Sequence, residues 1–154
     1  MPAPAPFVVE EYVRWSDVDY AGIIFYGSYI RFFEIAETEL FRAAGLPYGA
    51  VFDSFGIFLP RKTMQSEFFR PARLDDHLRV ASYIARVGTT SMTINFDVTW
   101  GGVSTLGAAA SQVLVCVDRQ TLVPRPLPPE LLRALARYTM PAEAARAALH
   151  IALP

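Results

Sequence analysis

The chain has few of the residues that bind metal ions or form disulfides. Its 154 residues include one cysteine, Cys116, and two histidines, His77 and His150. One cysteine excludes a disulfide within the chain, and two distant histidines are too few for the common zinc motifs or for a Ser-His-Asp arrangement. We therefore expect no metal site, and the low cysteine content favours a reducing compartment.

An excess of one charge and a long hydrophobic run are also missing. The chain has 14 Lys+Arg and 15 Asp+Glu, for a net charge of -1, whereas nucleic-acid-binding domains usually carry a strong basic excess. No apolar run approaches the ~18 residues of a membrane span. Residues 1–6 have neither the basic nor the apolar region of a signal peptide. The expectation is a cytoplasmic protein that binds neither nucleic acid nor membrane.

Apolar residues, by contrast, are abundant. They make up 53% of the chain and charged residues only 19%, against roughly 45–50% and about 25% in a typical soluble domain. This composition excludes a disordered chain, and a chain of this length forms one domain. The apolar excess predicts a large core, an oligomer interface, or both.

The sequence predicts one long helix and a run of strands. The helix is expected at 29–44, between a capping Ser28 and a terminating Gly45. A turn of 100° per residue places Glu37 at the edge of one apolar face, which consists of Tyr29, Phe32, Phe33, Ala36, Leu40, Ala43 and Ala44. Strands are expected at 7–15, 58–69, 78–87, 92–100 and 108–117, with a short piece at 122–123. Further helices are expected at 128–138 and 141–150, with 48–55 as a linking segment.

Consecutive strands joined by short turns pair antiparallel. The fold class is therefore α+β, with one long central helix wrapped by a curved antiparallel sheet. Residues 1–6 are expected to form a Pro/Ala arm, 7–138 the folded domain and 139–154 a C-terminal extension. One helix cannot cover such a sheet, so we expect its free edge or face to be buried in a homo-oligomer, at least a dimer.

The densest group of polar residues lies just before the long helix. Asp17 and Asp19 lie in this loop, and aspartate is common in turns, so one interpretation is structural. The other is catalytic. The N–H groups around Tyr26 and Gly27 lack partners inside the helix and lie at its positive end, where they can hold an oxyanion. A nearby carboxylate can attack a carbonyl or activate water, which suits acyl transfer without a metal or a histidine.

These residues belong to a longer stretch that resembles a known family. Residues 14–29, Arg-Trp-Ser-Asp-Val-Asp-Tyr-Ala-Gly-Ile-Ile-Phe-Tyr-Gly-Ser-Tyr, look like the signature of hotdog-fold acyl-CoA thioesterases of the 4-hydroxybenzoyl-CoA thioesterase type. Residues 69–76, Phe-Arg-Pro-Ala-Arg-Leu-Asp-Asp, look like the second recurring segment of that family. The resemblance covers roughly residues 7–138. It implies a hotdog fold and a thioester hydrolase, and it makes a homotetramer plausible.

The resemblance also assigns roles to single residues. It makes Asp19 the catalytic carboxylate and leaves Asp17 as a residue that shapes or caps the loop. The backbone N–H of Tyr26 matches the group that polarises the thioester carbonyl. Glu34 occupies the place of a helix carboxylate near the acyl pocket, where it would position water or substrate; the alternative is a solvated helix glutamate.

The chain departs from the family pattern in two places. Many relatives have His or Asn in the first helical turn, where this chain has Gly27 and Ser28. The aromatic-acyl type has a basic pair in a turn that here is the run of residues 88–91, Gly-Thr-Thr-Ser. The candidate residues for binding substrate and CoA are Gly27, Arg86, Thr89, Thr90 and Ser91. Four other basic residues are interpreted as solvated charges: Arg61, Lys62, Arg70 and Arg73.

The predicted function is hydrolysis of an acyl-CoA thioester to a free acid and CoA. The aromatic run at 25–33 favours an aromatic or medium-length acyl group. CoA is then part of the substrate, and no separate cofactor is expected. Two alternatives remain. One is a hotdog hydratase or dehydratase, which needs a catalytic histidine paired with an acid, and the other is a non-catalytic acyl-CoA-binding protein.

Overall fold

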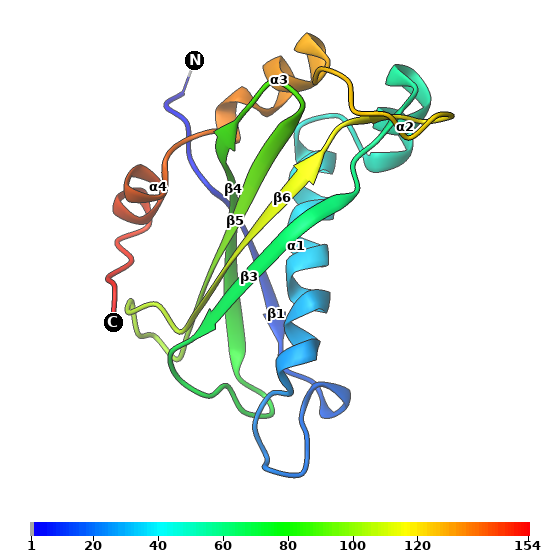
Figure 1. Cartoon of the computed structure of the whole chain (residues 1–154). Helices are drawn as coiled ribbons and strands as arrows, with labels where there is room; N and C mark the ends of the chain where they lie inside the picture. The colour runs from blue at the N-terminus through cyan, green and yellow to red at the C-terminus, as the bar shows by residue number, and fades with distance from the viewer. Residues whose placement is uncertain (1) are drawn as a thin grey trace.

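A five-stranded antiparallel sheet curves around one long helix in the computed structural model, which describes residues 2–154 (Figure 1). Its strands lie in the order β1-β4-β5-β6-β3. Their bounds are β1 (Phe7–Tyr12), β3 (Arg61–Phe68), β4 (His77–Val87), β5 (Ser91–Trp100) and β6 (Ala108–Val115). Two short strands, β2 (Ile57–Phe58) and β7 (Val117–Asp118), form a separate antiparallel pair. The α+β class is confirmed.

The long helix α1 (Tyr29–Ala43) lies against one face of the sheet. Its ring contacts include Phe33 stacked on Phe96 of β5, with ring centroids 4.8 Å apart. The helix ends where Gly45 takes a left-handed φ of 81°, as its sequence predicts. The buried face differs at its end from the predicted one, because Phe41 is buried and Ala43 is exposed.

The expected capping role of Ser28 is wrong. Ser28 has helical backbone angles, and its side chain makes no cap hydrogen bond. Helical backbone begins earlier, in a 3-10 turn at Tyr26–Ser28 that follows an extended Phe25. The hydroxyl of Ser28 donates to the backbone oxygen of Asp17 at 3.0 Å instead. The helical segment therefore starts at Tyr26, inside the loop region that carries the two aspartates.

Alternation along the strands separates the two faces of the sheet. On β5, Phe96 and Val98 face α1 and belong to the main core, while Asp97 points to the outer face. The helix α4 (Ala142–Ala148) covers part of this outer face, where Arg146 binds Asp97. Helix α3 (Pro129–Leu135) and a 3-10 turn at Ala136–Tyr138 precede it. At the other end of the chain, residues 2–5 are exposed and Pro6 is buried.

Four local expectations are wrong. The linking segment is a helix, α2 (Tyr48–Phe55), because its rings pack along one side, with Tyr48 and Phe52 stacked at 5.4 Å. The strand expected at 58–69 is divided around Pro60, which has no N–H for a ladder. Residues 122–123 form no strand, since Leu122 takes a left-handed φ of 59°. The first strand ends at Tyr12 rather than residue 15, and Trp15–Asp17 form a 3-10 turn.

No helix within residues 2–154 has the length and apolar character needed to cross a membrane.

Candidate active site

The first aspartate of the pair, Asp17, anchors the loop to the helix. Its side chain is buried, and its carboxylate accepts hydrogen bonds from the Arg14 backbone N–H at 2.7 Å and from the Arg31 guanidinium at 2.5 and 3.1 Å. Burial raises the pKa of Asp17, but the bonds from Arg31 and Arg14 outweigh it and hold the pKa below its usual value. With its carboxylate bound on both sides, Asp17 has a structural role.

The second aspartate, Asp19, is exposed at the start of a tight turn. Its Oδ1 accepts a hydrogen bond from the Ala21 N–H at 2.9 Å, and its backbone oxygen accepts one from the Gly22 N–H at 3.0 Å. Gly22 has a φ of 75°, which a residue with a side chain rarely adopts. The turn thus fixes one carboxylate oxygen of Asp19 and leaves the other oxygen available for chemistry.

The helix start presents unused backbone donors beside this turn. Within the described residues, the N–H groups of Tyr26 and Gly27 have no hydrogen-bond acceptor, as expected at the start of a helix. The N–H groups on either side are occupied, since Phe25 donates to the Asp17 oxygen at 2.8 Å and Ser28 donates to the Phe25 oxygen at 2.8 Å. A side chain at Gly27 would lie 2.6 Å from the Phe25 ring, so glycine lets that ring pack against the helix start.

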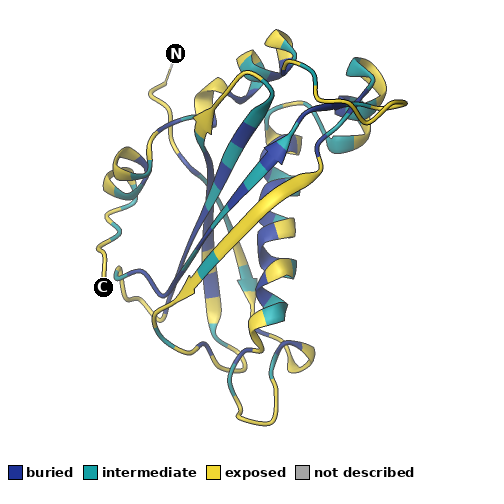
Figure 2. Cartoon of the chain, viewed as in Figure 1, coloured by how far each residue is buried: buried dark blue, intermediate teal, exposed yellow. Residues whose placement is uncertain are grey.

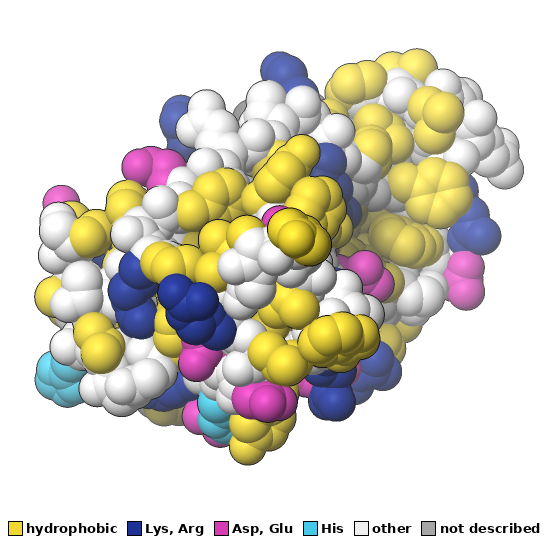
Figure 3. Space-filling view, turned by 90° about the horizontal axis from the view of Figure 1, so that it is seen from below, with side chains coloured by type: hydrophobic (Ala, Val, Ile, Leu, Met, Phe, Trp, Pro, Cys, Tyr) yellow, Lys and Arg dark blue, Asp and Glu magenta, His cyan; other side chains and the backbone are white. Residues whose placement is uncertain are grey.

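A pocket of about 390 Å³ joins the turn and the helix start. Its lining consists of Asp19, Ile23, Ile24, Tyr26, Tyr29, Phe68, Phe69, Arg70 and Pro71. All of these residues except Phe68 come from the two segments on which the family resemblance rests. A bridge between Ile23 and Arg73 and a hydrogen bond from the Ile24 N–H to the Ala72 oxygen hold the two segments together. The surface at this end of the molecule is rich in hydrophobic side chains, with charged ones between them (Figure 3). We call this cavity the Asp19 pocket.

The other predicted site residues lie outside the Asp19 pocket. Glu34 is exposed on α1 and does not line it. Arg86, Thr89, Thr90 and Ser91 lie at the β4–β5 turn, which is at the opposite end of the sheet from the start of α1 (Figure 1). One chain therefore brings Asp19, Tyr26 and Gly27 together but leaves the expected CoA-binding residues far from them.

Two of the arginines interpreted as solvated charges are instead held by the fold. Arg70 stacks on Trp100 and donates to the backbone oxygens of Trp100 and Thr105 at 3.1 and 3.3 Å. Arg61 at the start of β3 binds Glu37 of α1, which is buried, and donates to Gln112 at 3.2 Å. Burial raises the pKa of Glu37, and the charge of Arg61 opposes this effect. Sequence alone does not reveal these partners, because they come from elements distant along the chain.

Tyr29 and Arg70 line the pocket wall, a position that the sequence does not predict. Tyr29 lies on the core face of the helix, as expected, and is almost fully buried, at 2% exposure. Burial raises its pKa to about 12, partly opposed by the charge of Arg70. Its position three residues after Tyr26, one helical turn along, is the signal that could have placed it here.

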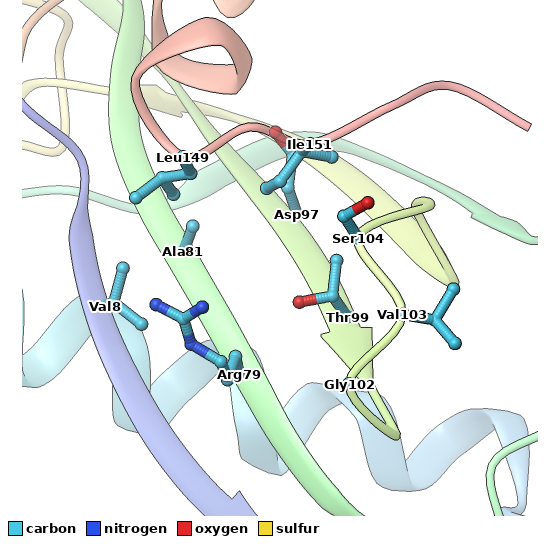
Figure 4. Close-up of a pocket in the computed structure, with 10 residues that line it drawn as sticks. All are labelled: Val8, Arg79, Ala81, Asp97, Thr99, Gly102, Val103, Ser104, Leu149 and Ile151. Atoms are coloured by element: carbon cyan, nitrogen blue, oxygen red, sulfur yellow. The ribbon is translucent and has the colours of Figure 1, made fainter.

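A second cavity lies on the outer face of the sheet, beneath the C-terminal segment (Figure 4). It measures about 170 Å³, and Asp97 is its buried acid. That carboxylate already accepts hydrogen bonds from Tyr83 at 2.8 Å and from Arg146 at 3.0 and 3.1 Å. Because both of its oxygens already accept hydrogen bonds, Asp97 has a structural role, and the cavity is not the candidate active site. Within residues 2–154, no three His, Cys, Asp or Glu side chains gather as a metal site would require.

Comparison with known proteins agrees with this geometry. A family model described as the thioesterase-like superfamily matches residues 13–135. The chain is 32% identical over 120 residues to the acyl-CoA thioester hydrolase YbgC of Escherichia coli O157:H7, covering 78% of this chain and 88% of that protein. It is 24% identical over 139 residues to a 1,4-dihydroxy-2-naphthoyl-CoA hydrolase of Nostoc punctiforme, covering 90% and 93%.

Solved structures show the same fold. A 1,4-dihydroxy-2-naphthoyl-CoA thioesterase from Synechocystis matches with a TM-score of 0.78 at 21% identity, covering 85% of this chain and 96% of that one. The protein SAV2348 from Staphylococcus aureus, solved in complex with CoA, matches with a TM-score of 0.79 at 14% identity, covering 90% and 86%. The hotdog fold expected from the sequence is confirmed.

Proposed function

The chain belongs to the thioesterase-like superfamily and is an acyl-CoA thioester hydrolase, and we propose that the Asp19 pocket is where it hydrolyses its substrate. The single observation that carries this assignment is that the Asp19 carboxylate, which has one oxygen without a hydrogen bond, lies near backbone N–H groups that have no acceptor. Asp19 and Tyr26 line one cavity, which is otherwise mostly apolar. We place the catalytic domain at residues 7–138, with 139–154 as a C-terminal extension, and the protein in the cytoplasm.

The reaction needs a group that holds the developing negative charge. When the thioester carbonyl is attacked, its oxygen becomes an oxyanion. The free N–H of Tyr26, with that of Gly27 beside it, lies at the positive end of α1 and can donate to this oxygen. These donors are part of the backbone, so they need no reorganisation during the reaction.

Two routes use the Asp19 carboxylate. In the first, Asp19 takes a proton from water while the water oxygen bonds to the carbonyl carbon. In the second, an oxygen of Asp19 attacks that carbon directly, giving an aspartyl anhydride that water then hydrolyses. In both, the carbon–sulfur bond breaks, the thiolate of CoA leaves and takes up a proton, and a carboxylic acid is released.

The walls of the pocket favour an apolar acyl group. Ile23, Ile24, Phe68 and Phe69 supply side chains to the wall, together with Pro71. A cavity of about 150 Å³ is enough for a benzene ring, so this pocket has room for an aromatic or medium-length acyl group. A thiol-release assay over a panel of acyl-CoA thioesters, with an acyl-carrier-protein thioester included, tests the proposal. A strong preference for acetyl-CoA or for a dicarboxylyl-CoA would contradict it.

A second copy of the chain completes the site in our proposal. Strand β3 is an edge strand that is exposed along nearly its whole length (Figure 2), and edges of this kind invite pairing. Its sequence places Met64, which is 39% exposed, near the middle of this edge. We propose that two β3 strands pair antiparallel about a two-fold axis, so that residues near the middle of one strand lie close to the same residues of the other. That pairing also moves the β4–β5 turn of one copy toward the end of the sheet that holds the other copy's pocket.

Light scattering at micromolar concentration should then give at least twice the mass of the chain, with a tetramer also allowed. Met64→Lys should weaken association about tenfold or more, because a lysine on a sheet edge opposes pairing and the two copies then bring like charges together. A monomeric wild-type protein would contradict the assembly, and unchanged association of the single variant would contradict the pairing through β3.

A further inference from the structure

The cavity on the outer face of the sheet takes no part in the proposed hydrolysis, yet its wall resembles that of a small-ligand site. Apolar side chains come from Val8, Ala81, Val103, Leu149 and Ile151. Polar groups are added by Arg79, Thr99 and Ser104, and by the buried acid Asp97. Ligand pockets typically combine an apolar wall with a few convergent polar groups.

Arg79 brings to this cavity a positive charge that the fold pairs only weakly. Its ion pair is with Glu10, the residue opposite it on β1, and the two charged atoms are 3.6 Å apart, beyond the length of a good hydrogen bond. Both side chains are about half exposed, and exposed pairs of this kind contribute little stability. The guanidinium of Arg79 can therefore exchange Glu10 for the anionic group of a ligand.

A hydroxyl donor lies beside this charge. Thr99 is the partner of Arg79 across β4 and β5, which brings their Cβ atoms to about 5 Å on the same face of the sheet. Figure 4 shows the Thr99 hydroxyl directed toward the Arg79 side of the cavity. A guanidinium and a hydroxyl side by side suit the two oxygens of a carboxylate. The charge of Asp97 opposes such a ligand little, because Arg146 binds that carboxylate at 3.0 and 3.1 Å.

We propose that this cavity binds a small carboxylic acid with a compact apolar body, of which benzoate is an example. The cavity measures about 170 Å³, and one of about 150 Å³ already holds a benzene ring. The ring would lie against Ala81 and Ile151 while the carboxylate binds Arg79 and Thr99. Acids of this class are what hydrolysis of an acyl-CoA releases. The cavity would thus bind a product of the reaction at a place that shares no lining residue with the Asp19 pocket.

One loop connects this cavity with the Asp19 pocket. Residues 101–107 join β5 to β6, and residues 102–104 of this loop line the outer cavity. Arg70, which lines the Asp19 pocket, donates to the backbone oxygens of Trp100 and Thr105 on either side of them, at 3.1 and 3.3 Å. A ligand that orders the loop therefore also acts on the position of Arg70. This link, unlike the binding itself, rests on the proposed function of the Asp19 pocket.

Binding of benzoate tests the site without any substrate. The measurement is calorimetric affinity, with benzamide as an uncharged probe of nearly the same shape. Benzoate should bind about tenfold more tightly or better, because only benzoate offers a charge to Arg79. Backbone NMR signals of residues 102–104 should shift when benzoate is added, and Ala81→Leu, which fills the cavity, should abolish these shifts. Equal affinities of the two probes, or shifts confined to the Asp19 pocket, would overturn the site.

Arg79→Met and Arg42→Met form a matched pair of variants. Methionine keeps most of the side-chain stem and removes the guanidinium. Arg42 is exposed to a similar extent, 57% against 53%, and pairs with Glu39, but it lies outside both cavities. Arg79→Met should weaken benzoate binding about tenfold or more, and Arg42→Met should leave it unchanged. If the two variants bind benzoate equally, the acid responds at most to the overall charge of the protein and the proposal is wrong.

Steady-state hydrolysis tests the link between the two cavities. Benzoate that acts through the loop should change kcat at saturating acyl-CoA, and Arg79→Met should remove this change. Purely competitive inhibition that Arg79→Met leaves intact would mean that the acid acts only in the Asp19 pocket, and it would overturn the link. Because the binding measurement needs no hydrolysis, a failure of the proposed role of the Asp19 pocket would remove the link and leave the site standing.

Discussion

Asp19→Asn should lower the rate of thioester hydrolysis by ~10²–10⁴-fold, the usual contribution of a general base. Asparagine keeps the shape of the side chain and the oxygen that accepts from the Ala21 N–H. It removes the negative charge needed either to attack the carbonyl or to take a proton from water. Direct attack would make the loss larger. Because the charge acts mainly in the transition state, substrate affinity should change little.

Asp17→Asn is the control for this measurement. The side chain of Asp17 is buried in contact with Arg31 and Arg14, and it does not line the pocket. This variant should keep most of its activity and lose about 1.5–3 kcal/mol of stability, the range for hydrogen bonds to charged groups. Turnover, substrate affinity and thermal midpoint of both variants decide the matter. Loss of turnover in Asp17→Asn with an active Asp19→Asn would reverse the two roles, and two active variants would exclude the mechanism.

Tyr26→Pro should reduce turnover by ~10²–10³-fold, the effect of losing one donor of an oxyanion hole. Proline removes the backbone N–H of residue 26 and is well tolerated at the first position of a helix. The preceding residue also suits proline, because Phe25 has φ -70° and ψ 132°, in the extended region that proline requires before it. The change therefore deletes one hydrogen-bond donor with little disturbance of the backbone.

Tyr26→Phe provides the comparison, since it keeps the N–H and removes only the exposed side-chain hydroxyl. We expect it to remain active within a few fold of the wild type. Circular dichroism and the thermal midpoint should show that both variants are folded. A folded and fully active Tyr26→Pro would mean that the oxyanion is held elsewhere, and an inactive Tyr26→Phe would transfer the role from the backbone to the hydroxyl.

Much of this site follows from local sequence. The aspartates, the glycine turn and the helix start lie within residues 17–29, so their proximity depends on short-range geometry. The helix at 29–44 and the presence of the main strands also follow from periodicity and turn residues. The order of the strands in the sheet does not, because β3 pairs with β6 rather than with β4, the next strand along the chain. In contrast, the sequence does not predict α2 as a helix. Its apolar segment is short, and the flanking Pro47 and Gly56 are equally typical of a loop.

The remaining features depend on contacts between distant segments. The sequence predicts Arg61 and Arg70 to be solvated surface charges, because no obvious partner lies near either of them along the chain. In the fold, Arg61 forms an ion pair with Glu37, and Arg70 stacks on the ring of Trp100. Tyr29 could be assigned to the core but not to the wall of a cavity, since the second wall comes from residues 68–71. Asp19 and the β4–β5 turn are far apart because β4 runs away from the end of the sheet where α1 begins. The spacing of residues along the sequence does not show this direction.

The anchoring of the loop by Asp17 has a consequence for how this enzyme can diversify. Its backbone oxygen accepts from Phe25 and Ser28 and its carboxylate binds Arg31, so the base of the loop is tied to the helix at several points. The tip is different, because Tyr20 is fully exposed. Tyr20 lies within the catalytic turn, but the bonds that close this turn join Asp19 to Ala21 and Gly22, so replacing the Tyr20 side chain can alter what approaches the entrance without breaking them. Such a division between a rigid base and a variable tip gives directed evolution a place to change substrate preference while the reaction chemistry is preserved.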